Sequence, residues 1–432
     1  MAKSKSKKVT LEEALVPVER QPYEVPENWC WVRQDTVCSL ADGEKRTEEE
    51  HPYLEVKYLR GVKNADLVTK GKYIIEGSKV ILVDGENSGE VFSIFESGYM
   101  GSTFKQLLIS DELNADYIQF FINTKREYYK NNKKGSAIPH LNKELFREMP
   151  FPLPPLPEQQ RIVEQIESLF AKLDEVKEKA QEVVDRVETN IEAILYNAFS
   201  GKLTQSWRKE NCIDDNWENS TLSKIVSGLK YGSSDKSDYN NNGTPVLRIP
   251  NIGEGVIDFS DLKYMQGELE NSSHEVFEND ILIIRSNGSR DLVGKCALVP
   301  ALEQRYAYAS FLIRIKASDK VLPNYLVRYI NSSMARGQLF AKAKSSSGIH
   351  NINSKELGSI RIAVPTIEEQ TEILKIIELL IKKELDVKNI TGQMIENIAE
   401  LKKSILAKAF RGELGTNIKT EESAIELLKS IL

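Results

Sequence analysis

The sequence of 432 residues lacks the marks of several protein classes. Its four cysteines are scattered without a CxxC pair, which argues against a disulfide framework and against a zinc site. Its four histidines are equally far apart, so no metal site is expected. No apolar run approaches the ~18 residues that cross a bilayer, and no apolar segment follows the lysines of the N-terminus. We therefore expect a cytoplasmic protein that binds no metal and enters no membrane.

The sequence also lacks the motifs of several enzyme classes. A methyltransferase would show a glycine-rich cofactor loop and an NPP[YF]-type tetrapeptide, and the chain contains neither NPP nor DPP. The nearest approach to a GxxxxGK[ST] loop, from Gly288 to Cys296, has the wrong spacing and no terminal hydroxyl. The ExK fragment at Glu55 and Lys57 has no Pro-Asp before it, and we interpret both residues as outward positions of a half-buried strand. We predict no catalytic activity.

The net charge of −6 is unevenly distributed along the chain. Residues 158–199 contain ten acidic and five basic residues, whereas residues 281–316 contain six basic and two acidic ones. Contact with a polyanion depends on local basic surface and not on net charge. The acidic total therefore does not exclude a nucleic-acid partner.

One stretch, from Pro150 to Leu203, organises the chain. A proline-stiffened lead-in precedes apolar residues spaced four and three apart, which is the pattern of a coiled-coil seam. The seam positions are Ile162, Ile166, Leu169, Leu173, Val176, Ala180, Val183 and Val187, and the later positions Ile191, Ile194 and Ala198 indicate a stutter that locally unwinds the supercoil. Gly201 can provide the left-handed cap. A helix from Glu158 to Phe199 would be roughly 60 Å long, more than one compact domain needs.

The same pattern returns between Val364 and Gly415. We align Glu158, Gln160, Ile166 and Leu169 with Glu368, Gln370, Ile376 and Leu379, and AFSG at 198–201 with AFRG at 409–412. The second seam runs through Ile373, Ile377, Leu380, Glu384, Val387, Thr391, Met394, Ile398, Leu401 and Ile405. Thr366 and Glu369 predict a capping box at its start. The chain therefore contains two copies of one unit, and we expect the helices to pair antiparallel.

A globular region precedes each helix. Trp29 and Trp217 open the two regions, and we expect both in the cores. Short apolar runs between Gly, Asn and Asp clusters predict strands, among them YLEVKYL, YIIEGSKVILV and FKQLLI in the first region and Ile281 to Ile284 in the second. A helix over 115–130 is matched by the segment 324–340, which aligns Tyr117 with Tyr325.

Two kinds of loop have side chains suited to nucleic acid. The segments NNKKGSAIPHLNKEL and AKSSSGIHNINSKEL, one in each copy, offer lysines and hydroxyls for phosphate contacts. The loop from Arg285 to Arg290 offers guanidiniums and an amide, the groups that read guanine and adenine edges. Its counterpart from Asp84 to Gly89 has different chemistry, so we expect the two copies to read different things.

These features together resemble the specificity subunit of type I restriction-modification systems. The resemblance rests on two divergent modules, each followed by a PLPEQQRIVEQI or TIEEQTEILKII helix that ends in AFSGKL or AFRGEL, and it covers about Gln21 to Gly415. It implies an α/β (α+β) fold, with two tandem similar target-recognition domains separated by two long antiparallel coiled-coil helices in a pseudo-twofold internal repeat.

The expected domain boundaries follow from the same repeat. They are an N-terminal arm at 1–20, target-recognition domain 1 at 21–157, the first long helix at 158–203, target-recognition domain 2 at 204–365, the second long helix at 366–415 and a C-terminal helix at 416–432. We interpret the N-terminal arm as a docking segment or a mobile arm, with direct DNA contact as the alternative. Together with the C-terminal helix, it is expected to close the two ends of the chain against each other or against a partner.

The resemblance also implies a function and a set of partners. Each domain would read one half of a bipartite site in double-stranded DNA, and the helices would set the spacer. Two methyltransferase subunits would dock on the scaffold, and restriction or motor subunits would join the full complex. The chain itself would hold no cofactor, because S-adenosylmethionine, ATP and magnesium would belong to the partner subunits.

Candidate DNA contacts follow from the loops and nearby basic residues. For base reading we predict Lys57, Arg60, Lys63, Asn87 and Ser88 in domain 1 and Arg248, Asn251, Arg285, Asn287, Ser289 and Arg290 in domain 2. For phosphate contacts we predict Lys105, Lys133, Lys134, Lys342, Lys344 and Ser346.

A second class of function is a non-enzymatic coiled-coil interaction scaffold whose modules bind protein. The two classes differ in whether the modules bind duplex DNA with a steep salt dependence. A fragment of a fused restriction-modification enzyme is disfavoured, since both ends resemble natural termini.

Overall fold

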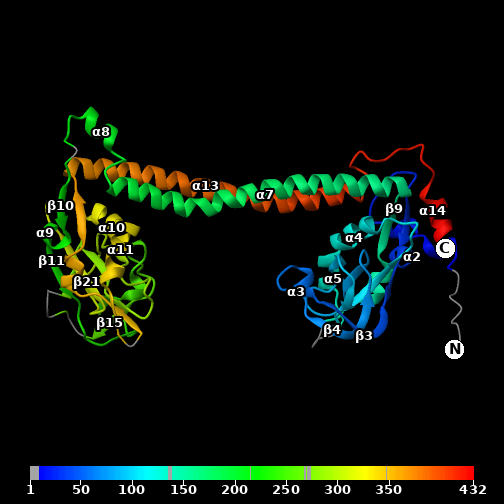
Figure 1. Ribbon diagram of the computed structural model, residues 1–432, viewed down its shortest axis with the longest axis horizontal. Coiled ribbons are helices and arrows are strands. Elements are labelled where there is room, and N and C mark those ends of the chain that lie inside the picture. The colour runs from blue at the N-terminus through cyan, green and yellow to red at the C-terminus, as the bar shows by residue number, and fades with distance from the viewer. Residues whose placement is uncertain (1–8, 135–138, 215, 267–268, 270–273, 347) are drawn as a thin grey trace. The chain divides into compact units, whose positions relative to one another are not determined.

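The computed structural model describes residues 9–134, 139–214, 216–266, 269, 274–346 and 348–432. It divides into two compact units, unit 1 (residues 1–180 and 393–432) and unit 2 (residues 181–392). Each unit contains one globular module and part of each of two long helices, α7 (Leu156–Phe199) and α13 (Ile367–Ala409) (Figure 1). The predicted organisation of two modules and two long helices is confirmed.

The long helices run antiparallel within each unit. In unit 1, Lys402 of α13 pairs with Asp174 of α7, with 2.6 Å between Nζ and Oδ1. In unit 2, the Asn190 amide of α7 donates to the Glu384 carboxylate of α13 over 3.1 Å. Late residues of one helix therefore meet early residues of the other, as predicted.

The predicted seam is correct along most of α7 but shifts along α13. Ile162, Ile166, Ala180 and Val187 are buried, whereas Val176 and Val183 are 38% and 42% exposed. On α13 the predicted seam residues Ile373, Ile377 and Ile398 are buried, whereas others turn outward, because a helix of 3.6 residues per turn drifts against a repeat of 3.5. The predicted seam residues Val387, Met394 and Leu401 are therefore exposed by 41%, 42% and 51%.

The helix starts also correct the alignment of the two copies. The Trp29 indole donates to Glu158 over 2.7 Å, and the Trp217 indole donates to Glu369 over 3.0 Å. Glu158 therefore corresponds to Glu369 and not to Glu368, and the counterparts of Gln160, Ile166 and Leu169 also move on by one residue. Adjacent glutamates at 368 and 369 made both alignments possible in the sequence.

Only half of the predicted capping box is present. The Glu369 amide donates to the Thr366 hydroxyl over 3.3 Å. The Glu369 carboxylate instead accepts from Thr204, which follows α7, and from Trp217, which opens the second globular region. We call the surroundings of Glu158 junction 1 and those of Glu369 junction 2.

Each module begins and ends with a strand pair beside its helix. β1 (Cys30–Arg33) pairs antiparallel with β9 (Pro150–Leu153) before α7, and β10 (Glu218–Thr221) pairs antiparallel with β24 (Arg361–Val364) before α13. We call residues 30–153 module 1 and residues 218–364 module 2. The repeat predicted from the sequence thus extends into the modules.

Module 1 contains a four-stranded sheet of order β2-β8-β5-β6 and three further strands, β3, β4 and β7, that pair with one another. The bounds are β2 (Cys38–Ala41), β3 (Glu44–Leu54), β4 (Leu67–Ile74), β5 (Lys79–Leu82), β6 (Val91–Ser93), β7 (Gly98–Met100) and β8 (Phe104–Ile109). The predicted strands within 73–83 and at 104–109 are confirmed.

One strand prediction in module 1 is wrong. The run YLEVKYL leaves β3 at Leu54 and forms a helical turn, α3 (Val56–Leu59), whose apolar side chains pack on the core beside β3. Glu55 and Lys57 are therefore not outward residues of a strand. Over four residues, alternation did not distinguish a strand from a single turn of helix.

Module 2 contains two five-stranded sheets, of order β11-β21-β17-β19-β14 and β12-β15-β13-β20-β16, and a small sheet of order β18-β23-β22. The bounds are β11 (Val226–Tyr231), β12 (Ser237–Asp238), β13 (Gly243–Leu247), β14 (Gly255–Val256), β15 (Lys263–Gln266), β16 (Glu275–Val276), β17 (Ile281–Ile284), β18 (Ser286–Asn287), β19 (Cys296–Leu298), β20 (Tyr306–Tyr308), β21 (Leu312–Ala317), β22 (Lys344–Ser346) and β23 (Ile349–Asn351). The predicted buried strand at 281–284 is confirmed, because all four residues are fully buried.

In each module two helices cover the sheets beside the helix end. They are α4 (Ala115–Thr124) and α5 (Arg126–Asn131) in module 1, and α10 (Pro323–Asn331) and α11 (Ser333–Lys342) in module 2. The single predicted helix is thus broken at Lys125 and at Ser332. Tyr117 packs on Phe410 with ring centroids 5.2 Å apart, and Tyr325 packs on Phe199 at 5.3 Å, which confirms their alignment.

The short helices are one or two turns long. They are α2 (Gln34–Val37), α6 (Lys143–Glu148), α8 (Gln205–Glu210), α9 (Leu222–Ile225) and α12 (Ser354–Gly358), with 3₁₀ turns η1 (Val18–Arg20) and η2 (Ile249–Asn251). Trp29 is buried as predicted, whereas Trp217 is half-buried.

The two ends of the described chain meet in unit 1. Ala14 of α1 (Leu11–Ala14) and Leu428 of α14 (Ala424–Ile431) are buried in the same core. The Ala424 amide also donates to the Asn28 carbonyl over 2.9 Å. The expectation that the two ends close against each other is confirmed. Within the residues described, no helix is both long enough and apolar enough to span a membrane.

Candidate nucleic-acid interface

In module 2, two segments far apart in the sequence form one exposed tip. Directly after the buried strand β17, Ser286 and Asn287 pair with Asn351 and His350 of β23. β23 in turn pairs with β22. The arginine loop and the lysine and serine segment, which the sequence placed in separate regions, therefore lie side by side. We call residues 285–290 and 348–351 tip 2.

Module 1 builds the same arrangement with other residues. Asp84 bridges to His140, and the Gly85 amide donates to the Pro139 carbonyl over 2.9 Å. The Leu141 amide donates to the Val83 carbonyl over 2.7 Å and thereby joins the second segment to the end of β5. We call residues 84–89, 133–134 and 139–140 tip 1.

A glycine ends the first loop of each tip. Gly89 (φ +99°) and Gly294 (φ +89°) donate to Leu82 and Ile284, the last residues of the strands before the loops. A Cβ at Gly89 would lie 2.9 Å from Tyr129, and a Cβ at Gly294 would lie 2.8 Å from Leu339. Only glycine fits this backbone and this close approach to α5 or α11. The tips are therefore fixed by the fold.

Arg285 is the most tightly held side chain of tip 2. Its Nε donates to the Ser310 carbonyl over 2.7 Å, and its Nη1 donates to the Asn351 side chain over 3.3 Å. Its Cζ lies 4.8 Å from the centroid of the Tyr231 ring. No carboxylate pairs with Arg285 in the part of the chain that the structure describes.

The remaining cation of tip 2 also lies on an aromatic ring. The Arg290 Cζ is 5.0 Å from the Phe340 ring centroid, and Arg336 of α11 is 4.7 Å from the same ring. Burial lowers the pKa of the Arg336 guanidinium. Ser289 is exposed, and its amide donates to the Asn287 side chain over 2.7 Å. The predicted residues Arg285, Asn287, Ser289 and Arg290 are thus brought together.

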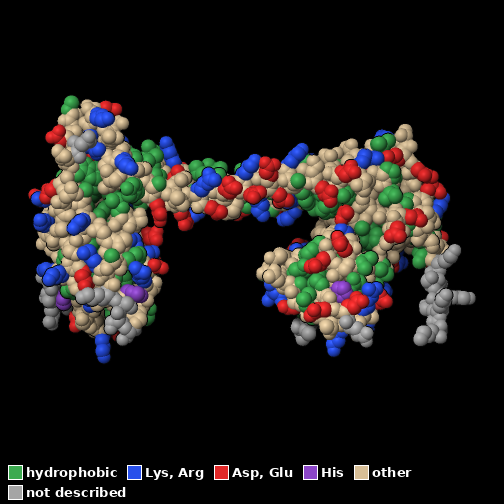
Figure 2. Space-filling view, in the orientation of Figure 1, with side chains coloured by type: hydrophobic (Ala, Val, Ile, Leu, Met, Phe, Trp, Pro, Cys, Tyr) green, Lys and Arg blue, Asp and Glu red, His purple; other side chains and the backbone are tan. Residues whose placement is uncertain are grey.

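In tip 1 and its surroundings, carboxylates pair with the cations. Glu90 accepts from Arg60 and, over 2.9 Å, from Arg126. Lys134 pairs with Glu144 at 2.5 Å, and this contact lowers the pKa of Glu144. Figure 2 shows basic and acidic side chains interspersed over the visible face of unit 1.

The other residues of tip 1 bond within the tip or next to it. The Asn87 amide oxygen accepts from Arg126 over 3.2 Å, and Lys133 donates to the Glu86 carbonyl over 2.9 Å. His140 Nδ1 lies 2.6 Å from the Asp84 carboxylate. Tip 1 therefore presents a histidine and a carboxylate where tip 2 presents arginines.

Three predicted base readers have their functional groups buried or bonded. Ser88 is fully buried, so its hydroxyl does not reach solvent. Asn251 is 1% exposed, and its amide donates to the carbonyls of Asp258 and Asp261. Arg248 pairs with Asp261 at 3.1 Å. Arg248 and Asn251 hold the turn around η2.

Other predicted contacts in module 1 lie outside tip 1. Lys63 is held by Glu55 at 2.6 Å and by Asp66 at 2.9 Å, and these bonds raise the pKa of the Lys63 ammonium. Lys105 and Lys72 share Asp42, and their hydrogen bonds lower the pKa of Asp42 to about 2. Lys57 is exposed on α3, away from the backbone pairing that forms the tip.

The predicted phosphate contacts of module 2 lie at the base of tip 2. Lys342 is the last residue of α11 and is half-buried. Lys344 and Ser346 belong to β22, and their side chains lie outside the described part of the structure.

Sequence reasoning missed several residues of tip 2 and its rim. Asn351 and Tyr231 contact Arg285, and the Phe311 ring is 55% exposed beside Ser310. The Tyr231 hydroxyl accepts from the Ser354 amide over 2.8 Å. No local spacing connects residues 231, 285, 311 and 351, because only the sheet brings them together.

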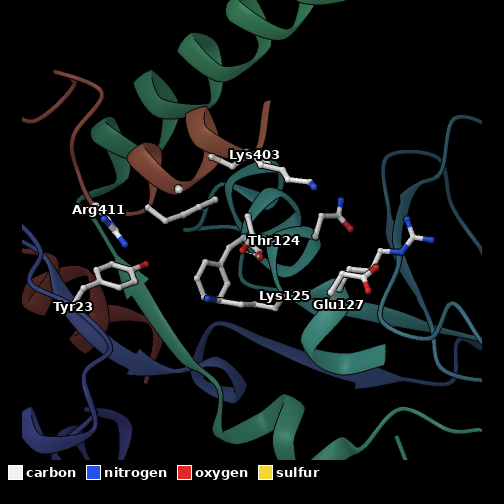
Figure 3. A pocket seen from close by; sticks show the side chains of 12 residues that line it. Tyr23, Thr124, Lys125, Glu127, Lys403 and Arg411 are labelled. Atoms are coloured by element: carbon white, nitrogen blue, oxygen red, sulfur yellow. Dashed lines mark hydrogen bonds between the residues drawn. The ribbon is translucent and has the colours of Figure 1, made fainter. Parts of the chain in front are cut away.

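A separate pocket of about 550 Å³ lies in unit 1 between the α4–α5 break and the end of α13 (Figure 3). Arg411 lies beside Tyr23 in this view, with Cζ 5.3 Å from the ring centroid, and Lys403 extends from α13. Lys125 lies 5.2 Å from the Phe121 ring, and burial lowers its pKa. Aligned on the repeat, Lys125 and Arg411 correspond to Ser333 and Ser200, so the cations are specific to unit 1.

The geometry defines a class of protein, a scaffold of paired helices that holds two modules, each with a loop tip suited to nucleic acid. The family described as Type I restriction modification DNA specificity domain matches residues 26–185 and 214–397. Each match contains one module and the first part of the helix that follows. Since the two matches together cover most of the sequence, the chain belongs to this family.

Relatives of similar length support this assignment. The chain is 28% identical to the type I restriction enzyme EcoKI specificity subunit of Escherichia coli K12, over 94% of this chain and 95% of the relative. It is 25% identical to the StySPI specificity subunit of Salmonella potsdam, over 92% and 91%. It is 28% identical to the MjaVIII specificity subunit of Methanocaldococcus jannaschii, over 90% and 94%.

Solved structures share the fold. The HsdS subunit from Thermoanaerobacter tengcongensis matches with a TM-score of 0.62 and 17% identity, over 92% of this chain and all of that chain. A chain from a study of complex assembly in the type I R-M system matches with a TM-score of 0.67 and 18% identity, over 91% of this chain and all of that chain. At these identities the likeness concerns the fold.

Proposed function

We propose that the chain is the sequence-specific DNA-recognition subunit of a type I restriction-modification complex, and that each module reads one half of a bipartite duplex target. One observation carries the proposal beyond the family assignment. The two modules build the same tip from the same backbone positions but fill it with different side chains. Different base-reading groups on one framework are what two unlike half-sites require.

The paired helices would set the distance between the two half-sites. Each has more than 40 residues, a length that no single module core needs. Removing one heptad from each helix shortens the pair by about 10 Å, which equals about three base pairs of duplex. We expect the selected target of this variant to keep both halves and to lose about three base pairs of spacer. An unchanged spacer would rule out the role in spacing.

Methyltransferase subunits would dock along the helices, one on each unit. This proposal is supported by exposed apolar side chains on the helices, since such side chains are typical of a surface that another protein covers. They are Val176, Met394 and Leu401 in unit 1, and Val183, Leu379, Leu385, Val387 and Ile390 in unit 2. Figure 2 shows hydrophobic side chains among charged residues of both signs on the visible side of the helices.

The chain would act without catalysing a reaction. The methyltransferase and restriction subunits would hold S-adenosylmethionine, ATP and magnesium, and the assembled complex would work on DNA in the cytoplasm. The missing catalytic and nucleotide-binding motifs support this division of labour.

The experiment is selection of bound duplexes from a random library, with this chain alone and with its cognate methyltransferase subunit. Two short enriched halves separated by a gap of constant length are the expected result. If no motif emerges under either condition, the DNA-reading proposal fails and the protein-binding scaffold takes its place.

A further inference from the structure

We propose that Arg285 reads a guanine with the outer edge of its guanidinium, and that Tyr231 and Asn351 are positioning residues that hold this edge toward the base. The inference rests on the proposed function, since it names the base that one tip recognises. It is carried by the contacts of one side chain, which leave a particular pair of donors available.

The backbone of Arg285 is fixed on both sides. It follows β17, whose four residues are fully buried. Its amide donates to the Phe311 carbonyl over 3.0 Å, and its carbonyl accepts from the Ile352 amide over 2.8 Å. The side chain therefore starts from a rigid position and not from a mobile loop.

Three contacts then orient the guanidinium. The Nε–H donates to the Ser310 carbonyl, one Nη1–H donates to the Asn351 amide oxygen, and the Tyr231 ring covers one face. The Tyr231 hydroxyl is itself held at the start of α12, 2.8 Å from the Ser354 amide and 3.2 Å from the Ser354 hydroxyl. Each of these contacts restricts rotation about a side-chain bond before DNA binds. The entropy cost of ordering this arginine on binding is therefore smaller than for a free side chain.

The contacts that remain possible point to guanine. Because Nε donates to Ser310, the guanidinium cannot bind an acceptor pair through Nε and Nη2, and the hydrogens that remain are one on Nη1 and two on Nη2. An acceptor pair must approach them in the guanidinium plane. Guanine presents the adjacent acceptors O6 and N7 in the major groove, and Arg binds them in this bidentate way. Arg285 is also not neutralised by a carboxylate among the described residues, whereas Glu90 pairs with Arg60 and Arg126 in module 1.

Arg290 is the internal contrast. It is exposed at the end of the same loop and rests on Phe340, and within the described residues no backbone hydrogen bond fixes its guanidinium. A side chain of this kind suits a phosphate, which accepts from many directions. Arg285 is thus the better candidate for reading a base, and Arg290 for contacting the backbone.

The test uses the complex of the full chain with its methyltransferase subunit and the duplex selected by the wild type. Binding is measured for that duplex and for duplexes changed at each position of the half-site that module 2 reads. Arg285→Ala should lose about ten- to a hundredfold of the preference for guanine at one position and keep the preferences at the others. Arg285→Lys keeps the charge but not the fork, so it should lose the same preference while non-specific affinity persists.

The positioning role has its own matched pair. Tyr231→Phe keeps the ring over the guanidinium and removes only the hydroxyl bonds to Ser354, so it should retain most of the guanine preference. Tyr231→Leu removes the ring and should lose the preference at the same position as Arg285→Lys, with the other half-site still read. A merely structural role of Tyr231 would instead weaken every position of the half-site equally in both variants.

The outcomes separate this inference from the function on which it rests. A uniform loss of affinity over all sequences in Arg285→Ala and Arg285→Lys would make Arg285 a phosphate contact and overturn the inference. Unchanged preferences would overturn it as well. If the wild-type complex selects no motif, the proposed function itself fails, and that result is visible before any variant is made.

Discussion

Units 1 and 2 repeat the same backbone contacts but differ in how they neutralise charge. Around tip 1, Glu90 holds Arg60 and Arg126, whereas in tip 2 Arg285 and Arg290 lie on aromatic rings. The geometry shared by both tips is the strand, the bonded second segment and the left-handed glycine. The fold thus requires that geometry, while the charged groups are free to differ between the two tips.

At the junctions, the paired charges lie in unit 2 and not in unit 1, which is the reverse of the tips. Glu158 accepts from the neutral groups of Trp29 and Asn417, both within 2.8 Å. Glu369 accepts from Trp217, Thr204 and Arg208, and Arg208 lies 2.5 Å away with 6% of its side chain exposed. Here unit 2 has the charged pair. The indole-to-carboxylate bond is the part common to both junctions.

The largest expected difference comes from the two matched substitutions Glu369→Gln and Glu158→Gln. Glu369→Gln removes the buried carboxylate that pairs with Arg208 and accepts from Trp217 and Thr204, and it should lower the free energy of unfolding of unit 2 by about 3–5 kcal/mol. Glu158→Gln keeps an acceptor for neutral donors and should cost unit 1 less than about 1 kcal/mol. Hydrogen exchange followed separately in the two units measures both effects.

Arg208→Met is the control for this pair. It removes the charge but leaves Glu369 with its neutral donors, so the carboxylate remains buried and unit 2 should again be destabilised. Equal and small effects of Glu369→Gln and Glu158→Gln would show that the two junctions do not differ in the way described.

The next effect concerns the glycines of tip 1. Gly85 and Gly89 both have a left-handed backbone, with φ +97° and +99°, but a Cβ at Gly85 meets nothing within 4 Å, whereas at Gly89 it would clash with Tyr129. Gly85→Ala should cost about 1 kcal/mol from backbone strain alone, and Gly89→Ala roughly 2–3 kcal/mol more through the forced shift of α5. Urea unfolding compares the two. Equal costs would contradict the close approach of tip and helix.

A smaller effect should appear in the salt dependence of DNA binding. Arg290 has no carboxylate partner in the described structure, so Arg290→Ala should reduce the slope of log K against log salt by about one. Lys134 is paired with Glu144 at 2.5 Å, so Lys134→Ala should change the slope much less. Binding titrations over a range of salt concentrations measure both slopes. A larger change for Lys134 would contradict the conclusion that the cations of tip 1 are neutralised and those of tip 2 are not.

The smallest expected effect is the pH dependence of junction 1. Burial raises the pKa of Glu158 above 4.5, opposed in part by the Trp29 bond. A raised pKa means that the folded state binds the proton more tightly, so this group favours folding below pH 4.5 and loses that contribution as pH rises through the folded pKa. Wild-type unit 1 should therefore lose stability relative to Glu158→Gln as pH is raised from about 4 to about 8. Denaturation at both pH values tests the sign.

Sequence patterns predicted the long-range organisation well because helix periodicity is regular over many turns. The helix starts, the antiparallel pairing, the aligned Tyr117 and Tyr325 and the buried strand before Arg285 all follow from such patterns. Errors arose where one residue of register mattered. Adjacent glutamates hid the true partner of Glu158, and helical drift moved Val387, Met394 and Leu401 to the outside.

The candidate site was predicted only in part for a different reason. The residues of the Arg285 loop were visible because they are consecutive in the sequence. Asn251 and Ser88 have the same polar chemistry, yet their groups are buried, and burial depends on contacts that no local pattern shows. Tyr231 and Asn351 escaped notice because strand pairing alone brings them to Arg285.

The most direct test of the central claim, that each module reads its own half-site, is duplex selection with a chain in which module 2 replaces module 1. The wild-type chain, assayed in parallel with the same methyltransferase subunit, should select two different halves. Module 1 is attached to the start of α7 and module 2 to the start of α13, and the two helices run antiparallel. The variant should therefore select two copies of the module 2 half-site in opposite orientation. Retention of the original module 1 half-site by this variant would contradict the account.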